Sequence, residues 1–288
     1  MKYLSADFKI SCQDGMMQIV RDLLADAAGN AGFESFVETD YGLCGYIQEK
    51  KYSKVLLDNC INELGISGIV INYSINELED KNWNSAWEQS GFDPIHVGKH
   101  ITIYDAKHTE KKAIDNKDGQ INVFVDAVQA FGTGTHYTTR MVVRCLESLD
   151  LRGKDILDCG CGTGILGIVA SKMGAKHVTA YDIDKWSADN ARHNATINGV
   201  DNMDVFLGDS SVLTKIQDKF DVVLANINRN ILLEDMPQFY KSMRAGAKLV
   251  LSGFYEADIE LLEKKAVTFG LNEEERIVDD NWSCIVLS

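Results

Sequence analysis

Residues 154–164 combine an acidic side chain with three alternating glycines, a spacing typical of a ligand-binding turn. Asp158 ends an apolar run, Gly160, Gly162 and Gly164 follow it, and a helical apolar pattern begins directly afterwards. This order predicts a strand, a tight turn and a helix N-terminus, which is where open α/β sheets bind nucleotide-like ligands. Glycines in such a turn let the backbone approach a ligand more closely than side chains would permit.

A second acidic residue, Asp182, ends the next apolar run, at residues 177–182. A carboxylate at the end of the second strand suits a bidentate hydrogen bond to a ribose diol. Gly162, Gly164 and Gly167 also fit the G-x-G-x-x-G pattern of NAD-binding proteins, with Asp182 about where an NAD enzyme requires its acid. The pattern therefore leaves two cofactors to compare, NAD and S-adenosylmethionine.

The charge of Asp158 separates these two cofactors. In an NAD enzyme its carboxylate would lie where a pyrophosphate sits, which is electrostatically unfavourable. Beside S-adenosylmethionine the same carboxylate would face a cationic amino acid moiety, which is favourable. We therefore expect S-adenosylmethionine, held by Asp158, the three glycines and Asp182; a glycine turn without a ligand is the remaining alternative.

The loop at residues 130–139, AFGTGTHYTT, contains two glycines and four threonines just before a predicted helix. This content exceeds what a helix cap requires. We therefore expect a lid that closes over the ligand, with Thr139 touching the carboxylate of the cofactor; a simple N-cap is the alternative. His136 lies in the same loop, where a structural role is more common than that of a general base.

Asn226 follows a predicted strand at the rim where a parallel sheet places its active site. In amino-methyltransferases, a side-chain amide here accepts a hydrogen bond from the target amine and aims the nitrogen lone pair at the methyl group. Many such enzymes continue with two prolines and an aromatic residue, whereas this chain has residues 227–229, Ile-Asn-Arg. Without that stacking platform we expect an aliphatic amine as acceptor. Asn228 and Asn230 are candidates for helix caps, so Asn226 alone is predicted to be catalytic.

From residue 153 onward, strand and helix patterns alternate along the chain. We predict strands at residues 154–159, 177–182, 203–207, 220–226, 247–253, 273–279 and 282–287, and helices at residues 164–173, 185–198, 230–244 and 256–269. Such alternation implies a mainly parallel sheet with right-handed crossovers. The last two strands are joined so tightly that we expect an antiparallel pair, which methyltransferase sheets have and dinucleotide-binding domains lack.

The first 75 residues have a different element order. We predict strands at residues 3–10, 33–38, 43–48 and 68–75, and helices at residues 14–28 and 51–64. This β-α-β-β-α-β order is that of a ferredoxin-like unit. We expect the second helix to bury one face made of Val55, Leu56, Ile61 and Leu64.

Between the two halves, residues 77–90 carry Trp83 and Trp87 four positions apart, which predicts a connecting helix with both rings on one face. Residues 95–104 and 121–125 follow as predicted strands, and the polar stretch between them is predicted to be an exposed loop.

The net charge of −14 over 288 residues disfavours nucleic acid and favours a basic protein as partner. Seven scattered cysteines argue against a disulfide framework, and we predict that Cys159 and Cys161 are packing residues and that no metal is bound. No apolar run is long enough for a membrane span, and the first residues lack a signal-peptide core. We therefore expect a monomeric protein in the cytoplasm.

Four segments together resemble the ribosomal protein L11 methyltransferase (PrmA) family in order and spacing: residues 130–136, 158–166, 182–184 and 225–227. The resemblance implies a class I methyltransferase fold that uses S-adenosylmethionine to methylate lysine side-chain or N-terminal amines of ribosomal protein L11. It also implies that Thr139, Gly160, Asp182 and Asn226 contact the cofactor or the amine. Tyr137, where the family usually has proline, and residues 228–229, usually small or apolar, depart from the pattern.

The resemblance further implies that the N-terminal domain grips the ribosomal protein. We accordingly expect a ferredoxin-like recognition domain at residues 1–76, a linker helix at residues 77–91 and a Rossmann-like methyltransferase domain at residues 92–288. The alternatives are an amino-methyltransferase acting on another protein or on RNA, a NAD-dependent oxidoreductase, and a non-catalytic module that binds S-adenosylmethionine.

Overall fold

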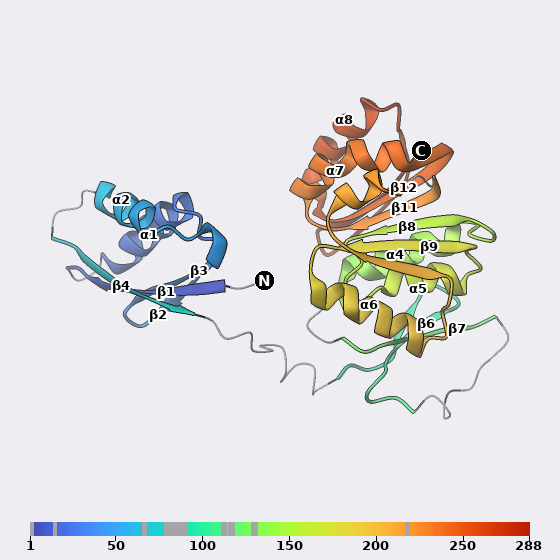
Figure 1. Cartoon of the computed structure of the whole chain (residues 1–288), viewed down its shortest axis with the longest axis horizontal. Coiled ribbons are helices and arrows are strands. Elements are labelled where there is room, and N and C mark those ends of the chain that lie inside the picture. The colour runs from blue at the N-terminus through green and yellow to red at the C-terminus, as the bar shows by residue number, and fades with distance from the viewer. Residues whose placement is uncertain are drawn as a thin grey trace. The chain divides into compact units, whose positions relative to one another are not determined.

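The computed structural model describes residues 3–13, 16–64, 68–77, 91–110, 114, 119–127, 132–216 and 219–288. They belong to two compact units, Met1–Trp83 and Asn84–Ser288 (Figure 1). The linker helix predicted around Trp83 and Trp87 falls outside the described residues. Within the described part of the chain, no helix is long and apolar enough to cross a bilayer.

The N-terminal unit is a four-stranded antiparallel sheet with two helices on one face (Figure 1). Its strands follow the order β2-β3-β1-β4 across the sheet. The elements along the chain are β1 (Tyr3–Ser11), α1 (Met17–Asn30), β2 (Ser35–Thr39), β3 (Gly42–Gln48), α2 (Lys54–Glu63) and β4 (Val70–Glu77). The predicted element order and the predicted hairpin between β2 and β3 are therefore confirmed.

The core of this unit forms where β1 turns alternate side chains toward the helices. Phe8 of β1 packs with Leu24 of α1, Ile47 of β3 and Leu57 of α2, and all four are buried. One part of the prediction for α2 is wrong, because Val55 and Leu56 are exposed to solvent and Leu57 holds the buried position. The periodicity of apolar residues predicted the helix, but with three successive aliphatic residues it did not determine which of them faces the core.

The second unit is built on a seven-stranded sheet with the order β10-β9-β8-β11-β12-β14-β13. Its strands are β8 (Asp155–Cys159), β9 (His177–Asp182), β10 (Met203–Leu207), β11 (Phe220–Asn226), β12 (Met243–Tyr255), β13 (Glu273–Asp279) and β14 (Trp282–Leu287). Strands β8 to β12 pair in parallel, and β14 pairs antiparallel with both β12 and β13. The predicted mixed sheet with an antiparallel terminal hairpin is confirmed.

Helices cover both faces of this sheet (Figure 1), so its central strands are apolar on both sides. The helices are α4 (Tyr137–Ser148), α5 (Ile165–Lys172), α6 (Lys185–Ile197), α7 (Arg229–Ser242) and α8 (Ile259–Val267). Successive residues of β11 and β12 alternate between two cores. Leu224 and Val250 pack on the side of α4 and α5, whereas Val223 and Leu249 pack on the side of α7 and α8.

A small three-stranded sheet precedes the large one and consists of β5 (Ile95–Val97), β6 (Ile101–Asp105) and β7 (Ile121–Val125). Residues 95–104, predicted as strand, are divided by a turn at Gly98, which has a left-handed φ of 60°. The Glu147 carboxylate of α4 accepts hydrogen bonds from the backbone N–H groups of Lys99 and His100 at 3.0 and 2.9 Å. The turn is thereby tied to the helix that borders the site described below.

Leu57 and Leu56 offer a matched test of the N-terminal core, since they are adjacent and their exposed fractions are 0% and 44%. We expect Leu57→Ala to lower the free energy of unfolding of this unit by about 2–5 kcal/mol, because it leaves a cavity among apolar side chains. Leu56→Ala is expected to cost less than about 1 kcal/mol. Urea unfolding of both variants checks this, and equal losses would contradict the packing described here.

Candidate active site

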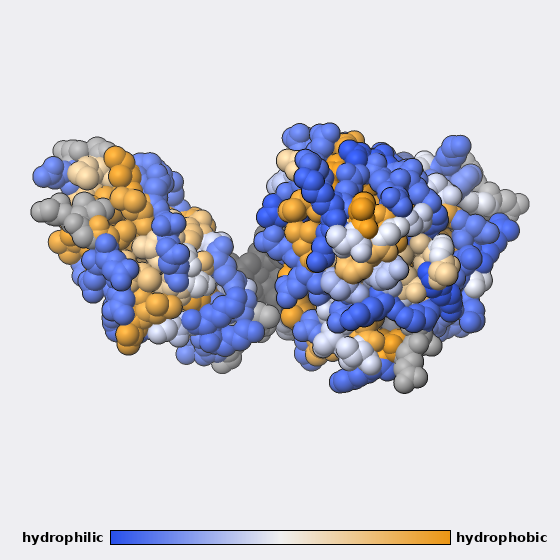
Figure 2. Space-filling view, turned by 90° about the horizontal axis from the view of Figure 1, so that it is seen from above, coloured by the Kyte–Doolittle hydropathy of each residue, from blue (hydrophilic) through white to orange (hydrophobic). Residues whose placement is uncertain are grey.

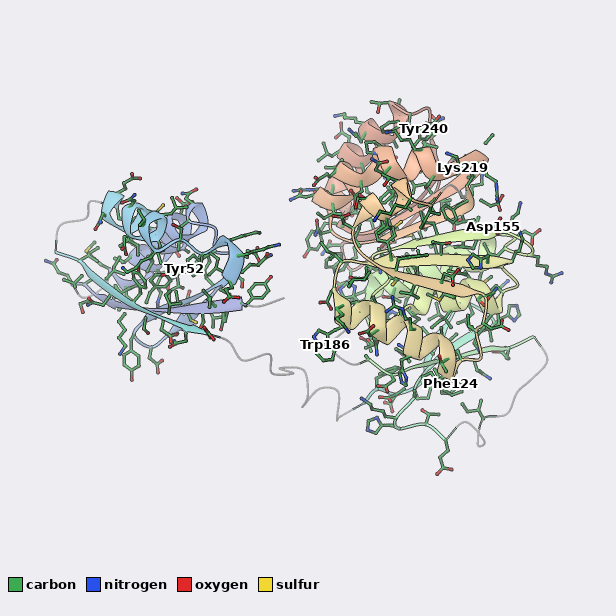
Figure 3. The ribbon with its side chains drawn as sticks, in the orientation of Figure 1. Tyr52, Phe124, Asp155, Trp186, Lys219 and Tyr240 are labelled. Carbon is green, nitrogen blue, oxygen red and sulfur yellow. The ribbon has the colours of Figure 1, made fainter. Side chains whose placement is uncertain are left out.

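A cavity of about 830 Å³ lies along the edge of the large sheet where its parallel strands end. Figure 3 marks both edges: Asp155 and Lys219 lie at the amino ends of β8 and β11, and Trp186 lies beyond the carboxyl end of β9. Five predicted site residues line the cavity together. They are Thr139, Gly160, Gly162, Asp182 and Asn226.

The turn after β8 has the tight backbone conformation that its glycines predict. Gly160, Gly162 and Gly164 have φ values of 65°, 53° and 77°, which favour glycine. The N–H of Cys161 donates to the carbonyl of Tyr181 at 3.0 Å, which joins this turn to the end of β9. The turn therefore presents backbone to the cavity rather than side chains.

Asp182 is held by this turn as well as by its own loop. Its Oδ2 accepts from the N–H of Gly162 at 2.9 Å, and its Oδ1 accepts from the N–H of Asp184 at 2.9 Å. Burial raises the pKa of Asp182, and the two backbone donors oppose that rise. Each carboxylate oxygen keeps a further lone pair, so the group can still accept hydrogen bonds from a ligand in the cavity.

Asp158 and Gly164 are not brought to the cavity wall. The Asp158 side chain is buried beneath the turn, where its Oδ2 accepts from the N–H of Gly167 at 3.0 Å. Gly164 is the N-cap of α5, and a Cβ there would lie 3.0 Å from the Cβ of Ala191 on α6. Both positions thus support the turn and its helix, and the expected contact of Asp158 with a cofactor has no support from its position.

The cysteines of the turn are also packing residues. Cys159 and Cys161 are both buried, and burial raises the pKa of each thiol well above its ordinary value. A neutral, enclosed thiol is neither a nucleophile nor a metal ligand.

The loop after β11 is pressed between two glycines. A Cβ on Gly160 would lie 2.5 Å from Cγ2 of Ile227, and a Cβ on Gly253 would collide with the backbone of Ile227. The N–H of Ile227 also donates to the carbonyl of Ser252 at 3.1 Å. Because both neighbours lack a Cβ, this loop and Asn226 can lie directly against the glycine turn.

Three buried polar atoms of cavity-lining residues have no partner within the described part of the chain. They are the hydroxyls of Thr139 and Tyr181 and the amide oxygen Oδ1 of Asn226. Leaving such atoms unpaired costs about 1–3 kcal/mol each, so native proteins rarely do so without a reason. Their position on a cavity wall indicates that a ligand supplies the missing hydrogen bonds.

His136 is the N-cap of α4, so the helix cap considered above as the alternative role of this loop comes from His136 and not from Thr139. Its ring Nδ1 accepts from the N–H of Thr138 at 3.3 Å and lies 2.8 Å from the hydroxyl of Thr138. Burial lowers the pKa of His136, and the Arg140 guanidinium lowers it further. The ring therefore faces the cavity as a neutral group near pH 7.

The remaining polar residues of the loop after β11 have structural partners. Asn228 is the N-cap of α7, with its Oδ1 accepting from the N–H of Ile231 at 3.2 Å, so its predicted capping role is confirmed. Arg229 pairs with Asp258 at 2.7 Å and with the side chain of Asn230. Neither Arg229 nor Asn230 lines the described cavity wall.

Several residues that the sequence analysis missed also line the cavity. Asp209, Glu234 and Asp235 add three carboxylates to that of Asp182, and Trp282 adds an indole ring. Asp209 could have been found, because it lies two residues after β10, the strand that pairs with the strand ended by Asp182. The other three belong to a helix face and a hairpin turn, which carry no local sequence signal.

The charge of the cavity wall discriminates between ligands. Its described residues include four carboxylates and no lysine or arginine. A pyrophosphate would find no cationic partner there, whereas a ligand with sulfonium and ammonium groups is electrostatically matched. This argues against NAD and fits S-adenosylmethionine.

Comparison with known proteins agrees with this geometry. The family model described as ribosomal protein L11 methyltransferase (PrmA) matches residues 18–288. Ribosomal protein L11 methyltransferases from Phocaeicola vulgatus and Bacteroides fragilis are 39% and 40% identical over 286 and 268 residues, covering 99% and 93% of this chain and 98% and 94% of theirs. The crystal structure of a ribosomal protein L11 methylase from Lactobacillus delbrueckii subsp. bulgaricus superposes with a TM-score of 0.62 at 26% identity, over 68% of this chain and 98% of that one.

The pKa of Asp158, which burial raises to about 7, predicts a pH-dependent stability. The pKa of an aspartate in the unfolded chain is ~3.9. At a pH between that value and the folded pKa, Asp158 is protonated in the folded state and ionised in the unfolded state. The free energy of unfolding therefore falls as the pH rises through this range. Asp158→Asn removes the titration and keeps an oxygen for Gly167. Relative to wild type, we expect its free energy of unfolding to rise on the order of 3 kcal/mol from pH 5 to pH 8.

Urea unfolding of the ligand-free protein at both pH values measures this difference. Asp201→Asn, at an exposed position, is the control for the exchange of a carboxylate for an amide. A pH-independent difference between Asp158→Asn and wild type would contradict the assignment.

The close approach around Ile227 predicts two different responses to added methyl groups. Gly160→Ala meets a side-chain atom, so Ile227→Ala should restore part of the lost stability, leaving about 1–2 kcal/mol for the left-handed backbone. Gly253→Ala meets backbone atoms, so Ile227→Ala should restore nothing. Thermal unfolding of the two double-mutant cycles checks this; equal rescue in both would refute the packing argument.

Proposed function

Since this chain belongs to the ribosomal protein L11 methyltransferase family, we propose that it transfers methyl groups from S-adenosylmethionine to amines of ribosomal protein L11. The acceptors would be lysine side chains, the N-terminal amine, or both. The observation that carries the proposal is the unpartnered amide oxygen of Asn226 at the end of β11, on the wall of an acidic cavity.

The residues of the cavity suit the parts of S-adenosylmethionine. Asp182 would accept hydrogen bonds from the ribose diol, and the glycine turn of residues 160–164 would lie against the cofactor backbone. Asp209, which lines the cavity just after β10, would accept from an exocyclic amine of the base. The hydroxyl of Thr139 would reach the carboxylate of the amino acid moiety, which supplies the hydrogen-bond partner that it lacks.

When bound, S-adenosylmethionine would supply a methyl group on its cationic sulfonium; in-line attack of the amine nitrogen on that methyl carbon would form the N–C bond as the S–C bond breaks, with the neutral thioether S-adenosylhomocysteine as the leaving group. Asn226 would accept a hydrogen bond from the amine and thereby aim the nitrogen lone pair at the methyl group. Burial beside the cationic sulfonium would lower the pKa of the incoming ammonium, which would lose its proton to solvent as it enters. Catalysis then consists mainly of positioning and desolvation.

The N-terminal unit would recognise the protein substrate. We infer that it is a ferredoxin-like domain, which is supported by its β-α-β-β-α-β order and by the strand order β2-β3-β1-β4. The net charge of −14 favours a basic protein as partner. The proposed division is a recognition domain within residues 1–76, a linker at residues 77–91 and a catalytic domain at residues 92–288.

Transfer of labelled methyl groups to purified ribosomal protein L11 tests the proposal and separates the roles of two residues. We expect Asp182→Ala to raise the Kd for S-adenosylmethionine about 10–100-fold, because a charged hydrogen-bond acceptor is lost. We expect Asn226→Ala to lower kcat on the order of 100-fold with a smaller change in that Kd. Calorimetry gives the Kd values, and steady-state kinetics gives kcat.

Asn230→Ala is the matched control, because it removes an exposed amide from the same segment. Its kcat should remain within about threefold of wild type. Binding of the cofactor without any labelling of L11 would refute the proposed substrate, and full activity of Asn226→Ala would refute the proposed catalytic role.

A further inference from the structure

One wall of the cavity is aromatic, and nothing in the proposed binding of the cofactor uses it. Trp282, at the start of β14, and His136, at the N-terminus of α4, both line the cavity. Their ring centroids are 4.9 Å apart with an interplanar angle of 73°. The Tyr255 ring lies behind the indole at 4.3 Å and 34°.

The backbone holds this wall in place. Trp282 and Tyr255 are cross-strand partners in the β12–β14 pair. Asp280 and Asn281, just before Trp282, have left-handed φ values of 50° and 65°, which define a tight hairpin turn. Together with the capping bond of His136, these contacts fix the aromatic rings before any ligand arrives, so little conformational entropy is lost on binding.

The wall is too far from the ribose-binding acid to belong to the base of the cofactor. In sheet order, β9 and β14 are separated by β8, β11 and β12. At a strand spacing of roughly 4.8 Å, the ends of β9 and β14 are about 19 Å apart. The aromatic wall instead shares its end of the cavity with Gly253 of β12, the strand next to β14, and with Asn226 of β11, one strand further along.

The chemistry of this end suits an aliphatic cation. Neutral aromatic faces attract ammonium groups and pack against methylene stems. The described lining of the cavity has four carboxylates and no lysine or arginine, which favours an incoming cation. We infer that Trp282, supported by His136 and Tyr255, forms the subsite that binds the aliphatic stem and ammonium head of the acceptor amine.

This inference rests on the proposed function and makes Trp282 a residue that determines which amines are methylated. A lysine side chain would lie along the indole face and present its nitrogen to Asn226. Each added methyl group enlarges the cation that the ring faces bind, so the subsite would also retain partly methylated amines for further turnover.

The experiment compares Trp282→Ala and Trp282→Phe with the wild type in methyl transfer to L11. Tyr240→Ala is the control, because Tyr240 is an aromatic residue of α7 with 42% of its surface exposed (Figure 3) and does not line the described cavity wall. We expect Trp282→Ala to lower kcat/KM for L11 at least tenfold while the Kd for S-adenosylmethionine changes less than threefold. Trp282→Phe should recover most of the loss, and Tyr240→Ala should match the wild type.

A kcat/KM for Trp282→Ala within twofold of wild type would overturn the subsite. A parallel loss of cofactor affinity in Trp282→Phe would also overturn it, since the ring would then belong to the cofactor site. Intact-mass analysis of L11 adds a second readout: fewer methyl groups per modified amine in Trp282→Phe supports the inference, and an unchanged distribution opposes it.

A small-molecule measurement keeps the subsite testable if the wild type labels no L11, a result that would refute the proposed function alone. The indole N–H signal that disappears in Trp282→Phe identifies Trp282 in an NMR spectrum. Choline should shift this signal, and its neutral isostere 3,3-dimethylbutan-1-ol should not, because only the former is a cation. Equal shifts, or none with either compound, would overturn the subsite.

Discussion

The arrangement of the site depends on the close approach of one residue, Ile227, to two glycines. The loop after β11 lies against the turn after β8 on one side and against β12 on the other, and Gly160 and Gly253 make room by lacking a Cβ. Asn226 reaches the cavity because the residue after it occupies that narrow space. The same approach explains how the glycine turn can line the cavity and also support the loop after β11.

Electrostatics gives the cavity its selectivity. Asp182, Asp209, Glu234 and Asp235 surround a space whose described lining contains no cationic side chain. Such a space favours the cationic cofactor and the cationic form of an amine on its way in, and it disfavours phosphate groups. The face of the unit that Figure 2 shows is of the mixed kind, with hydrophilic residues around separate apolar clusters.

Much of the fold could be predicted from the chain because its local signals agree with one another. The strands β9, β10, β11, β13 and β14 have the predicted bounds, since apolar runs ended by turn residues leave few alternatives. The rotation of α2 was mispredicted, because Val55, Leu56 and Leu57 are chemically alike and only tertiary packing selects the buried one.

The residues that line the cavity also fall into those that the sequence predicts and those that it does not. Thr139, Gly160, Gly162, Asp182 and Asn226 could be identified because each lies on a strand end or a loop with an unusual composition. Trp282 could not, because it reaches the cavity through a hairpin that is distant in sequence from the other segments. The burial of Asp158 beneath the turn could not be predicted either, because a sequence motif gives the order of residues and not how deeply each side chain is buried.

The position of β14 has a consequence for how the catalytic unit is made. This strand comes last along the chain, yet it lies inside the sheet, between β12 and β13. During synthesis, β12 therefore has an unpaired edge until residues 282–287 have left the ribosome, and unpaired edges invite association with other chains. Because the same strand carries Trp282, completion of the sheet and completion of the cavity wall are one event, and a nascent chain released before it would have neither.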